Sequence, residues 1–158
     1  MSSDTESRRH QIRILHASDL HASANRSLDQ GVLVKALLKD VEAFQKDVPI
    51  DLVVFSGDLA FSGKAEDFDL ARTMFLQPLM ESLRLTPERV VLVPGNHDID
   101  RSRINEYVEA GLQQKLTDRD AVNSLFAKEA ELRTAVERLE QWSDFSKTFY
   151  EPAGTGRG

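Results

Sequence analysis

Acidic, histidine and asparagine side chains recur in three short blocks within the first hundred residues. The blocks are Ser18-Asp19-Leu20-His21, Ser56-Gly57-Asp58 and Pro94-Gly95-Asn96-His97-Asp98. Carboxylates neutralise the charge of a divalent cation, imidazole favours zinc, iron or manganese, and an amide oxygen adds a neutral hard ligand. These residue types predict a site for divalent metal ions, in which one shared carboxylate would hold two ions roughly 3.5–4 Å apart.

Each block follows a short apolar run, at residues 12–17, 51–55 and 89–93. Runs of this length, rich in Val and Ile, are typical of strands buried on both faces of a parallel sheet. Helical periodicity fills the intervals at residues 31–46 and 66–85, and Pro78 is expected to kink or break the second helix. The order β-α-β-α-β predicts an α/β fold with right-handed crossovers.

The carboxyl ends of the strands in such a sheet form its ligand-binding edge. Asp58 follows Asp19 by 39 residues and Asn96 follows Asp58 by 38, so each interval is about one βαβ unit. Gly57 and Gly95 would let the backbone turn sharply after its strand. We therefore expect one sheet edge to carry the side chains of Asp19, His21, Asp58, Asn96 and His97.

The three blocks resemble the D-x-H, G-D and G-N-H-[DE] motifs of the calcineurin-like metallophosphoesterases, in the same order and spacing. The resemblance covers roughly residues 11 to 100. It implies the N-terminal β-α-β-α-β half of a two-sheet αββα sandwich, followed here by a helical segment. It also implies hydrolysis of phosphomonoesters or phosphodiesters, at a dinuclear metal centre, by metal-activated water.

The resemblance assigns four metal ligands by position. Asp19 and His21 would bind the first ion, Asp58 would bridge both ions, and Asn96 would bind the second. The implied cofactors are two divalent ions, with manganese, iron or zinc preferred and magnesium also admitted.

The same resemblance assigns two catalytic residues. His97 would lie by the substrate phosphate, as general acid for the leaving oxygen or as a stabiliser of the transition state, and Asp98 would orient its imidazole. Arg101 and Arg103 follow closely and could reach a phosphate as charged donors, the alternative being a solvated first helical turn.

The later family blocks, a lone H and G-H-x-H, are absent from the sequence. Its four histidines are His10, His16, His21 and His97, and His16 is expected to pack in the core. We therefore expect an N-terminal portion of a larger enzyme, inactive or weakly active alone, whose partners are a phosphate-ester substrate and the remainder of the domain beyond Gly158. A half-fold would expose an apolar sheet face and favour self-association.

Four segments are expected along the chain. Residues 1–10 form a flexible tail, 11–100 the partial phosphoesterase core, 101–150 a helical insertion or extension, and 151–158 a flexible Gly-rich end. Leu125, Leu132 and Leu139 recur every seven residues, which predicts one long helix starting at Thr117 or Asp118 and packing on its own domain rather than forming a coiled coil.

Composition sets further limits on the 158-residue chain. A hydrophobic fraction of 41% excludes wholesale disorder, and the net charge of −6 excludes a strongly basic nucleic-acid surface. The chain has no cysteine, and no apolar run reaches the roughly 18 residues that span a bilayer. With no apolar stretch of a signal peptide at the N-terminus, a soluble, cytoplasmic protein without membrane contact is expected.

Three alternative functions stay open at this point. The chain could belong to a DNA nuclease of the same superfamily, which salt-dependent DNA binding would support. It could be a non-catalytic scaffold or regulatory member, which would fold without metal. It could also be the sensor or effector head of a larger multidomain protein.

Overall fold

A three-stranded parallel sheet forms the centre of the chain, in the order β1-β2-β3. The structure, a computed structural model, describes residues 11–151, so the tails expected at residues 1–10 and 152–158 lie outside the described residues. The strands are β1 (Ile14–Ala17), β2 (Leu52–Ser56) and β3 (Val90–Val93). All three lie within one or two residues of the predicted runs, and the predicted α/β class is confirmed.

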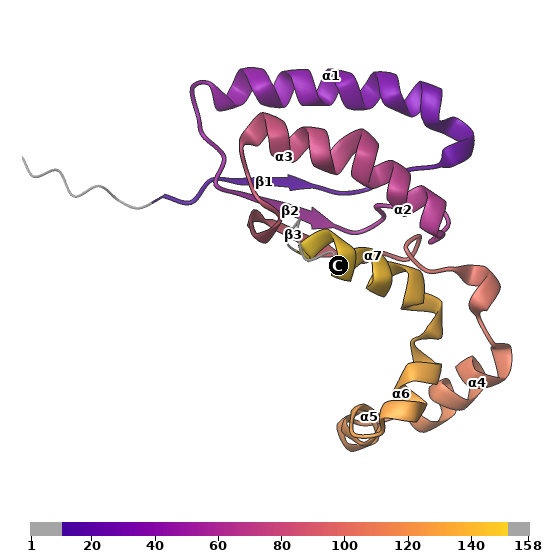
Figure 1. The fold of residues 1–158 in the computed structure, drawn as a ribbon. Helices are drawn as coiled ribbons and strands as arrows, with labels where there is room; N and C mark the ends of the chain where they lie inside the picture. Colours follow the sequence, from indigo (N-terminus) through magenta and orange to yellow (C-terminus); the bar gives the residue numbers. More distant parts are fainter. Residues whose placement is uncertain (1–10, 152–158) are drawn as a thin grey trace, which may run out of the picture.

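Two helical crossovers connect the strands on one face of the sheet (Figure 1). The first holds η1 (Ala24–Arg26) and α1 (Ser27–Gln45). The second holds α2 (Ala65–Ala71), the π-helical η2 (Arg72–Leu76), α3 (Gln77–Leu83) and η3 (Pro87–Arg89). The irregularity predicted at Pro78 takes the form of this π turn, since Pro78 has no N–H for the helical ladder and lies in the first turn of α3.

The hydrophobic core fills the space between the sheet and these helices. Phe55, Phe68 and Phe75 are almost completely buried there, and the rings of Phe55 and Phe75 meet edge to face at 5.8 Å. Strand pairing places Leu15 beside Val53 and Val53 beside Val90. The side chains of these three residues therefore lie on the same face of the sheet, toward the helices. This packing fixes the strand ends, and with them the loops that carry the three sequence blocks.

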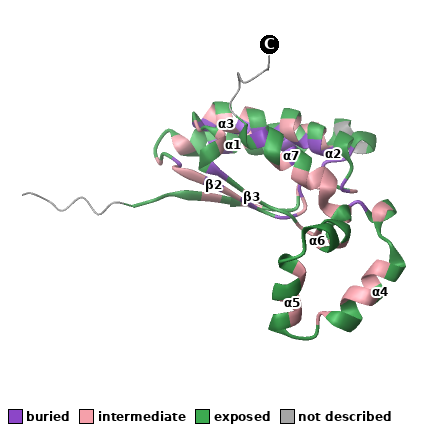
Figure 2. Cartoon of the chain, turned by 60° about the horizontal axis from the view of Figure 1, so that its bottom comes forward, coloured by how far each residue is buried: buried purple, intermediate pink, exposed green. Residues whose placement is uncertain are grey.

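The opposite face of the sheet is uncovered within residues 11–151 (Figure 2). Ile14, Val91 and Val93 are between 42% and 54% exposed on it. The exposed apolar sheet face expected of a half-fold is therefore present among the described residues, whereas the prediction that the strands are buried on both faces is wrong there. The core position expected for His16 is also wrong, because strand alternation places His16 on this face, where its Nε2 lies 2.7 Å from the hydroxyl of Ser56.

Short helices, not one long helix, follow the sheet. They are η4 (Arg101–Arg103), α4 (Glu106–Lys115), α5 (Arg119–Phe126), α6 (Glu129–Ala135), η5 (Glu137–Leu139) and α7 (Glu140–Tyr150). Asp118 does cap a helix start, accepting from the N–H of Ala121 at 2.8 Å. The backbone leaves the helical conformation at Lys128 and Val136, which places the three heptad leucines in separate elements.

Helices α4, α5 and α6 form an arm that extends away from the sheet, whereas α7 returns to it (Figure 1). No residue of the three arm helices is buried. Phe145 of α7 stacks on Phe68 with ring centroids 5.0 Å apart, which joins the end of the described chain to the core. Within residues 11–151 no helix has the length and apolar character needed to cross a membrane.

The last residue of α7 closes one edge of the sheet. The Tyr150 hydroxyl donates to the carbonyl of Val90 at 2.8 Å and accepts from the N–H of Leu92 at 3.2 Å. A residue on a parallel neighbouring strand would pair with the same two groups across from Val91. A single side-chain oxygen thus satisfies backbone groups that a fourth strand would otherwise occupy.

Candidate metal centre

Three of the predicted ligands have left-handed backbone conformations. The φ angles are 59° at Asp19, 48° at His21 and 57° at Asp58. Arg84, the fourth such non-glycine residue in the described chain, has an ordinary reason, since it ends helix α3. Positive φ is uncommon outside glycine and clusters at functional sites, because the surrounding structure must hold it in place.

Backbone hydrogen bonds beyond the strand ends hold the first two loops together. The N–H of Asp19 donates to the carbonyl of Gly57 at 3.0 Å, and the N–H of His21 donates to the carbonyl of Asp58 at 2.9 Å. Pairing then ends in a bridge between Ala22 and Ala60. The two loops therefore keep a fixed register, and the strained residues cannot relax independently.

The third loop is attached to the second through two carboxylates. Asp58 accepts from the N–H of His97 through Oδ1 at 2.9 Å. Asp98 is fully buried, and its carboxylate accepts from the N–H groups of Leu59, Ala60 and Gly95 at 3.2, 2.7 and 2.8 Å. Burial raises the pKa of Asp98 above its ordinary value of 3.8, while these backbone hydrogen bonds act in the opposite direction.

The hydrogen bonds of Asp98 differ from the expected ones. The family resemblance implied that Asp98 orients the imidazole of His97, but the Asp98 carboxylate accepts from three backbone N–H groups. The bend at residues 95–98 directs this carboxylate to the backbone of the second loop, at Leu59 and Ala60. The ring of His97 instead contacts the carbonyl oxygen of Phe61, which lies 2.8 Å from Nδ1.

This contact fixes the proton on the His97 ring. A carbonyl oxygen can only accept, so Nδ1 carries the hydrogen and Nε2 keeps a lone pair in the neutral ring. A second-shell carbonyl of this kind commonly fixes the tautomer of a metal-binding or catalytic histidine. The Nε2 atom of His97 is thus the atom available for chemistry.

Glycine at position 95 makes room for the Asp58 side chain. A Cβ atom at Gly95 would lie 2.1 Å from Oδ1 and 2.5 Å from the backbone nitrogen of Asp58. Gly57, with φ of 114°, adopts a conformation that other residues rarely enter. Both glycines that the sequence singled out therefore allow a close approach or a turn at this site.

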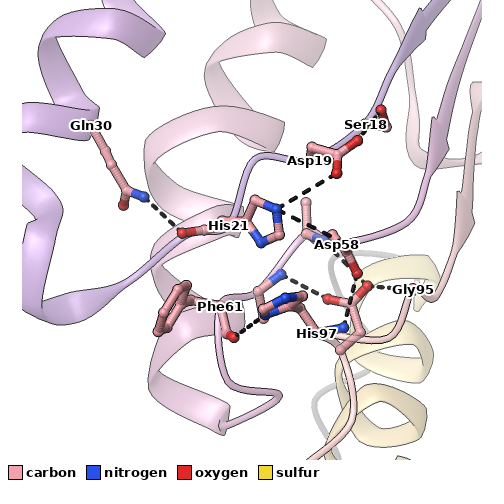
Figure 3. A network of polar contacts seen from close by, with 11 residues as sticks. Ser18, Asp19, His21, Gln30, Asp58, Phe61, Gly95 and His97 are labelled. Atoms are coloured by element: carbon pink, nitrogen blue, oxygen red, sulfur yellow. Dashed lines mark hydrogen bonds and ion pairs between the residues drawn. The ribbon is translucent and has the colours of Figure 1, made fainter.

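Two of the predicted ligands, His21 and Asp58, and the predicted catalytic residue His97 converge at the sheet edge (Figure 3). His21, Asp58 and His97 each offer one ligand atom, and these atoms lie within 4.8 Å of one another. The Nε2 atom of His21 is 3.6 Å from Oδ1 of Asp19 and 4.0 Å from Oδ2 of Asp58. These separations exceed a hydrogen bond, and ligands about 2.1 Å from one shared ion would lie at comparable separations.

The other ring nitrogen of His21 is a separate unsatisfied polar atom at this site. Nδ1 is buried and has no hydrogen-bond partner among the described residues. The rings of His21 and His97 are 4.6 Å apart at an interplanar angle of 83°. A buried polar atom without a partner is rare in folded proteins and commonly indicates a missing ion or water.

Three further predicted residues lie outside the cluster. Asn96 is exposed on the third loop, and its role as a ligand stays a prediction. Arg103 pairs with Glu140 at 2.5 Å and with Glu137 at 3.4 Å, so its guanidinium joins η4 to the start of α7. Arg101 is exposed on η4, and contact of either arginine with substrate also stays a prediction.

Two residues of the site were not identified from the sequence. Asp67 is 4% exposed and accepts from the N–H of Ala24 at 3.2 Å and from the N–H and hydroxyl of Ser62 at 3.1 and 2.6 Å. In the sequence it has only the signature of an acidic residue in a first helical turn. Phe61 has a stronger sequence signal than Asp67, because it is an aromatic residue three positions after Asp58 and aromatic side chains are common in binding sites.

Comparison with known proteins gives two findings. The family model described as calcineurin-like phosphoesterase matches residues 12–153. A Bacillus subtilis (strain 168) protein described as the uncharacterized metallophosphoesterase-like protein YydB is 27% identical over 138 residues. That alignment covers 87% of this chain and 28% of the Bacillus protein, so the chain spans less than a third of the length of the curated relative it matches.

Proposed function

Because the chain belongs to the calcineurin-like phosphoesterase family, we propose that it carries the metal centre of a hydrolase acting on phosphomonoesters or phosphodiesters. The observation that carries the proposal is the convergence of His21, Asp58 and His97 within 4.8 Å at the carboxyl end of the sheet. The substrate, the whole protein's activity and the number of bound ions belong to the proposal.

The residues present fit a divalent metal ion. Imidazole nitrogens and carboxylate oxygens are the donors that zinc, iron and manganese prefer. Nδ1 of His21, buried without a partner among the described residues, favours a bound ion or water beside this ring, and the separations of 3.6 and 4.0 Å from its Nε2 to the carboxylates of Asp19 and Asp58 suit ligands of one ion. Asp19, His21 and Asp58 would hold a first ion, and Asp58 with Asn96 would hold a second. An ion there lowers the pKa of water and neutralises the charge of a phosphate.

The protein's own residues supply positioning and a proton. His97, with Nδ1 held by the Phe61 carbonyl, keeps Nε2 for the substrate. When protonated, Nε2 donates to the leaving oxygen of the ester, which is general acid catalysis. Asp98 acts as a positioning residue, because its buried carboxylate holds the backbone of the second and third loops together.

The ligand count bears on how active the chain is alone. With Asp58 shared, the four predicted ligands give three donors to one ion and two to the other, fewer than a tightly held pair of ions needs. We propose that a further polypeptide segment supplies additional donors for full activity.

The test is hydrolysis of para-nitrophenyl phosphate and its bis-ester by the purified chain while Mn²⁺ is titrated in. Manganese binding is measured in parallel by calorimetry on the chain, on Asp58→Asn and on His97→Ala. Asp40→Asn, an exposed residue of α1, is the matched control. For the chain alone the proposal expects manganese binding with weak turnover, the binding lost in Asp58→Asn, the turnover lost in both site variants, and neither changed in the control.

Two other outcomes are informative. If the chain binds manganese weakly without turnover, and Asp58→Asn abolishes the binding, the metal centre stands and hydrolysis needs the additional donors. If the chain binds no manganese, or both site variants keep full turnover, the proposed function is wrong.

A further inference from the structure

An exposed aromatic ring lies directly beside the cluster. The Phe61 side chain is 42% exposed, and its ring centroid lies 5.7 Å from that of His97 and 6.4 Å from that of His21. In Figure 3, Phe61 lies on the opposite side of His21 from the carboxylate of Asp19. The cluster therefore has a charged side at Asp19 and an apolar side at Phe61.

The position of this ring is set by the backbone that carries it. The N–H of Phe61 donates to the carbonyl of Ala22 at 2.9 Å, and its carbonyl accepts from Nδ1 of His97. The preceding residue, Ala60, is fully buried, and the following residue, Ser62, is bonded to the buried carboxylate of Asp67. A single exposed apolar side chain is ordinary on a protein surface, but this one is held at a fixed distance from the predicted catalytic imidazole.

We propose that Phe61 determines substrate specificity by contacting a flat aromatic group of the substrate, an aryl or nucleobase ring attached to the phosphate ester. This inference rests on the proposed function, since it takes the phosphate to lie at His21, Asp58 and His97. A ring joined to a phosphate oxygen beside His97 falls within the roughly 4.5–7 Å range over which aromatic rings stack or meet edge to face. Esters with small aliphatic groups would reach the ions equally well but would leave the Phe61 ring in water.

The side chain and the backbone of Phe61 have separable roles. The carbonyl that holds His97 belongs to the backbone and persists when the side chain is changed, whereas contact with a substrate ring depends on the side chain. A specificity role therefore predicts a change in the ratio of affinities for aromatic and aliphatic ligands. A purely structural role predicts an equal change for both ligands and an unchanged ratio.

The experiment measures binding by calorimetry at fixed Mn²⁺ for inorganic phosphate, ethyl phosphate and phenyl phosphate. The full chain is compared with Phe61→Leu, which keeps an apolar side chain, and with Phe61→Tyr, which keeps the ring. The expected result is phenyl phosphate binding roughly threefold to tenfold more tightly than ethyl phosphate in the unchanged chain. Phe61→Leu should abolish this preference, bringing the ratio of phenyl phosphate to ethyl phosphate affinity to about one, and Phe61→Tyr should retain it.

The remaining outcomes separate the two proposals. If inorganic phosphate binds but phenyl phosphate has no advantage, or if Phe61→Leu keeps the full advantage, the role of Phe61 is refuted while the proposed function stands. If the chain binds manganese but none of the three anions, the role of Phe61 is refuted and the metal centre stands, and if it binds no manganese, both proposals fail. Circular dichroism of each variant checks that the fold is retained.

Discussion

Replacing Gly95 with alanine should damage the metal centre through a single methyl group. The new Cβ would lie 2.1 Å from Oδ1, 2.5 Å from the backbone nitrogen and 2.8 Å from Cγ of Asp58. Ordinary contact begins at 3.4 Å, so Oδ1 of Asp58 must move by more than an ångström and its backbone nitrogen by almost an ångström. The backbone of Asp58 is poorly able to move, because its φ is positive and its carbonyl accepts from His21.

The expected magnitude follows from two effects. Forcing an extra methyl group into a packed site destabilises a protein by about 1–3 kcal/mol. Displacing the Asp58 carboxylate also weakens its 2.9 Å hydrogen bond from the N–H of His97, and such bonds to charged groups contribute about 1.5–3 kcal/mol. Since the two losses overlap, we expect the free energy of unfolding of Gly95→Ala to fall by about 2–3 kcal/mol, which lowers the melting temperature of a chain this size by roughly 4–12 °C.

Urea unfolding and manganese calorimetry test this prediction, with Gly31→Ala as the matched control. A Cβ at Gly31 meets no atom within 4 Å, and the residue lies inside α1, so alanine there should stabilise the fold by about 0.5–1 kcal/mol and leave ion binding unchanged. Gly95→Ala should bind manganese at least tenfold more weakly. The reasoning is refuted if Gly95→Ala unfolds within 0.5 kcal/mol of the unchanged chain and binds the ion equally well.

Three further changes should alter stability in defined ways. Tyr150→Phe should lower the free energy of unfolding by about 1 kcal/mol, because two backbone groups of β3 lose their partner. Burial raises the pKa of the Tyr150 hydroxyl above 10.0, so the unfolded chain releases this proton at a lower pH than the folded chain. The free energy of unfolding should therefore fall as the pH rises from about 10 through the folded pKa. Urea titrations should show a smaller fall in Tyr150→Phe. Asp67→Ala should cost about 1–3 kcal/mol in the same assay, since it leaves part-buried donors of two loops unpaired, whereas the exposed Asp69→Ala should change stability by less than about 0.5 kcal/mol. Asp118→Ala should cost about 1 kcal/mol and speed amide exchange at the start of α5; unchanged exchange there would contradict the capping role.

The strands and the location of the site could be predicted from the sequence for a local reason. A short apolar run predicts a buried strand from its own residues alone, and the polar residues that follow the run mark the end of that strand. The parallel order of the strands therefore predicts a shared sheet edge for Asp19, His21, Asp58 and His97. Their left-handed backbone conformations carry no comparable sequence signal, because they arise from hydrogen bonds between loops.

The failed predictions concern contacts that are distant in sequence. His16 alternates with apolar residues in β1, and nothing within that strand indicates which face the helices cover. The leucine repeat predicts helical structure but not the breaks at Lys128 and Val136. Beyond these breaks the chain contacts a distant segment, since the carbonyl of Arg138 accepts from the N–H of Asp100. Asp98 adjoins His97 in sequence, but the bend of the loop points its carboxylate to the backbone of Leu59 and Ala60.

The hydroxyl of Tyr150 makes the two edges of the sheet unequal. At β3 it occupies the groups that an incoming strand needs, whereas within the described chain no strand pairs with the outer edge of β1. Open edges recruit strands from other molecules, and natural sheets protect them by blocking their backbone groups. Strand addition between copies would thus join β1 of one copy to β1 of another and stop at a pair, whereas loss of this one hydroxyl would free the second edge that an open-ended polymer needs.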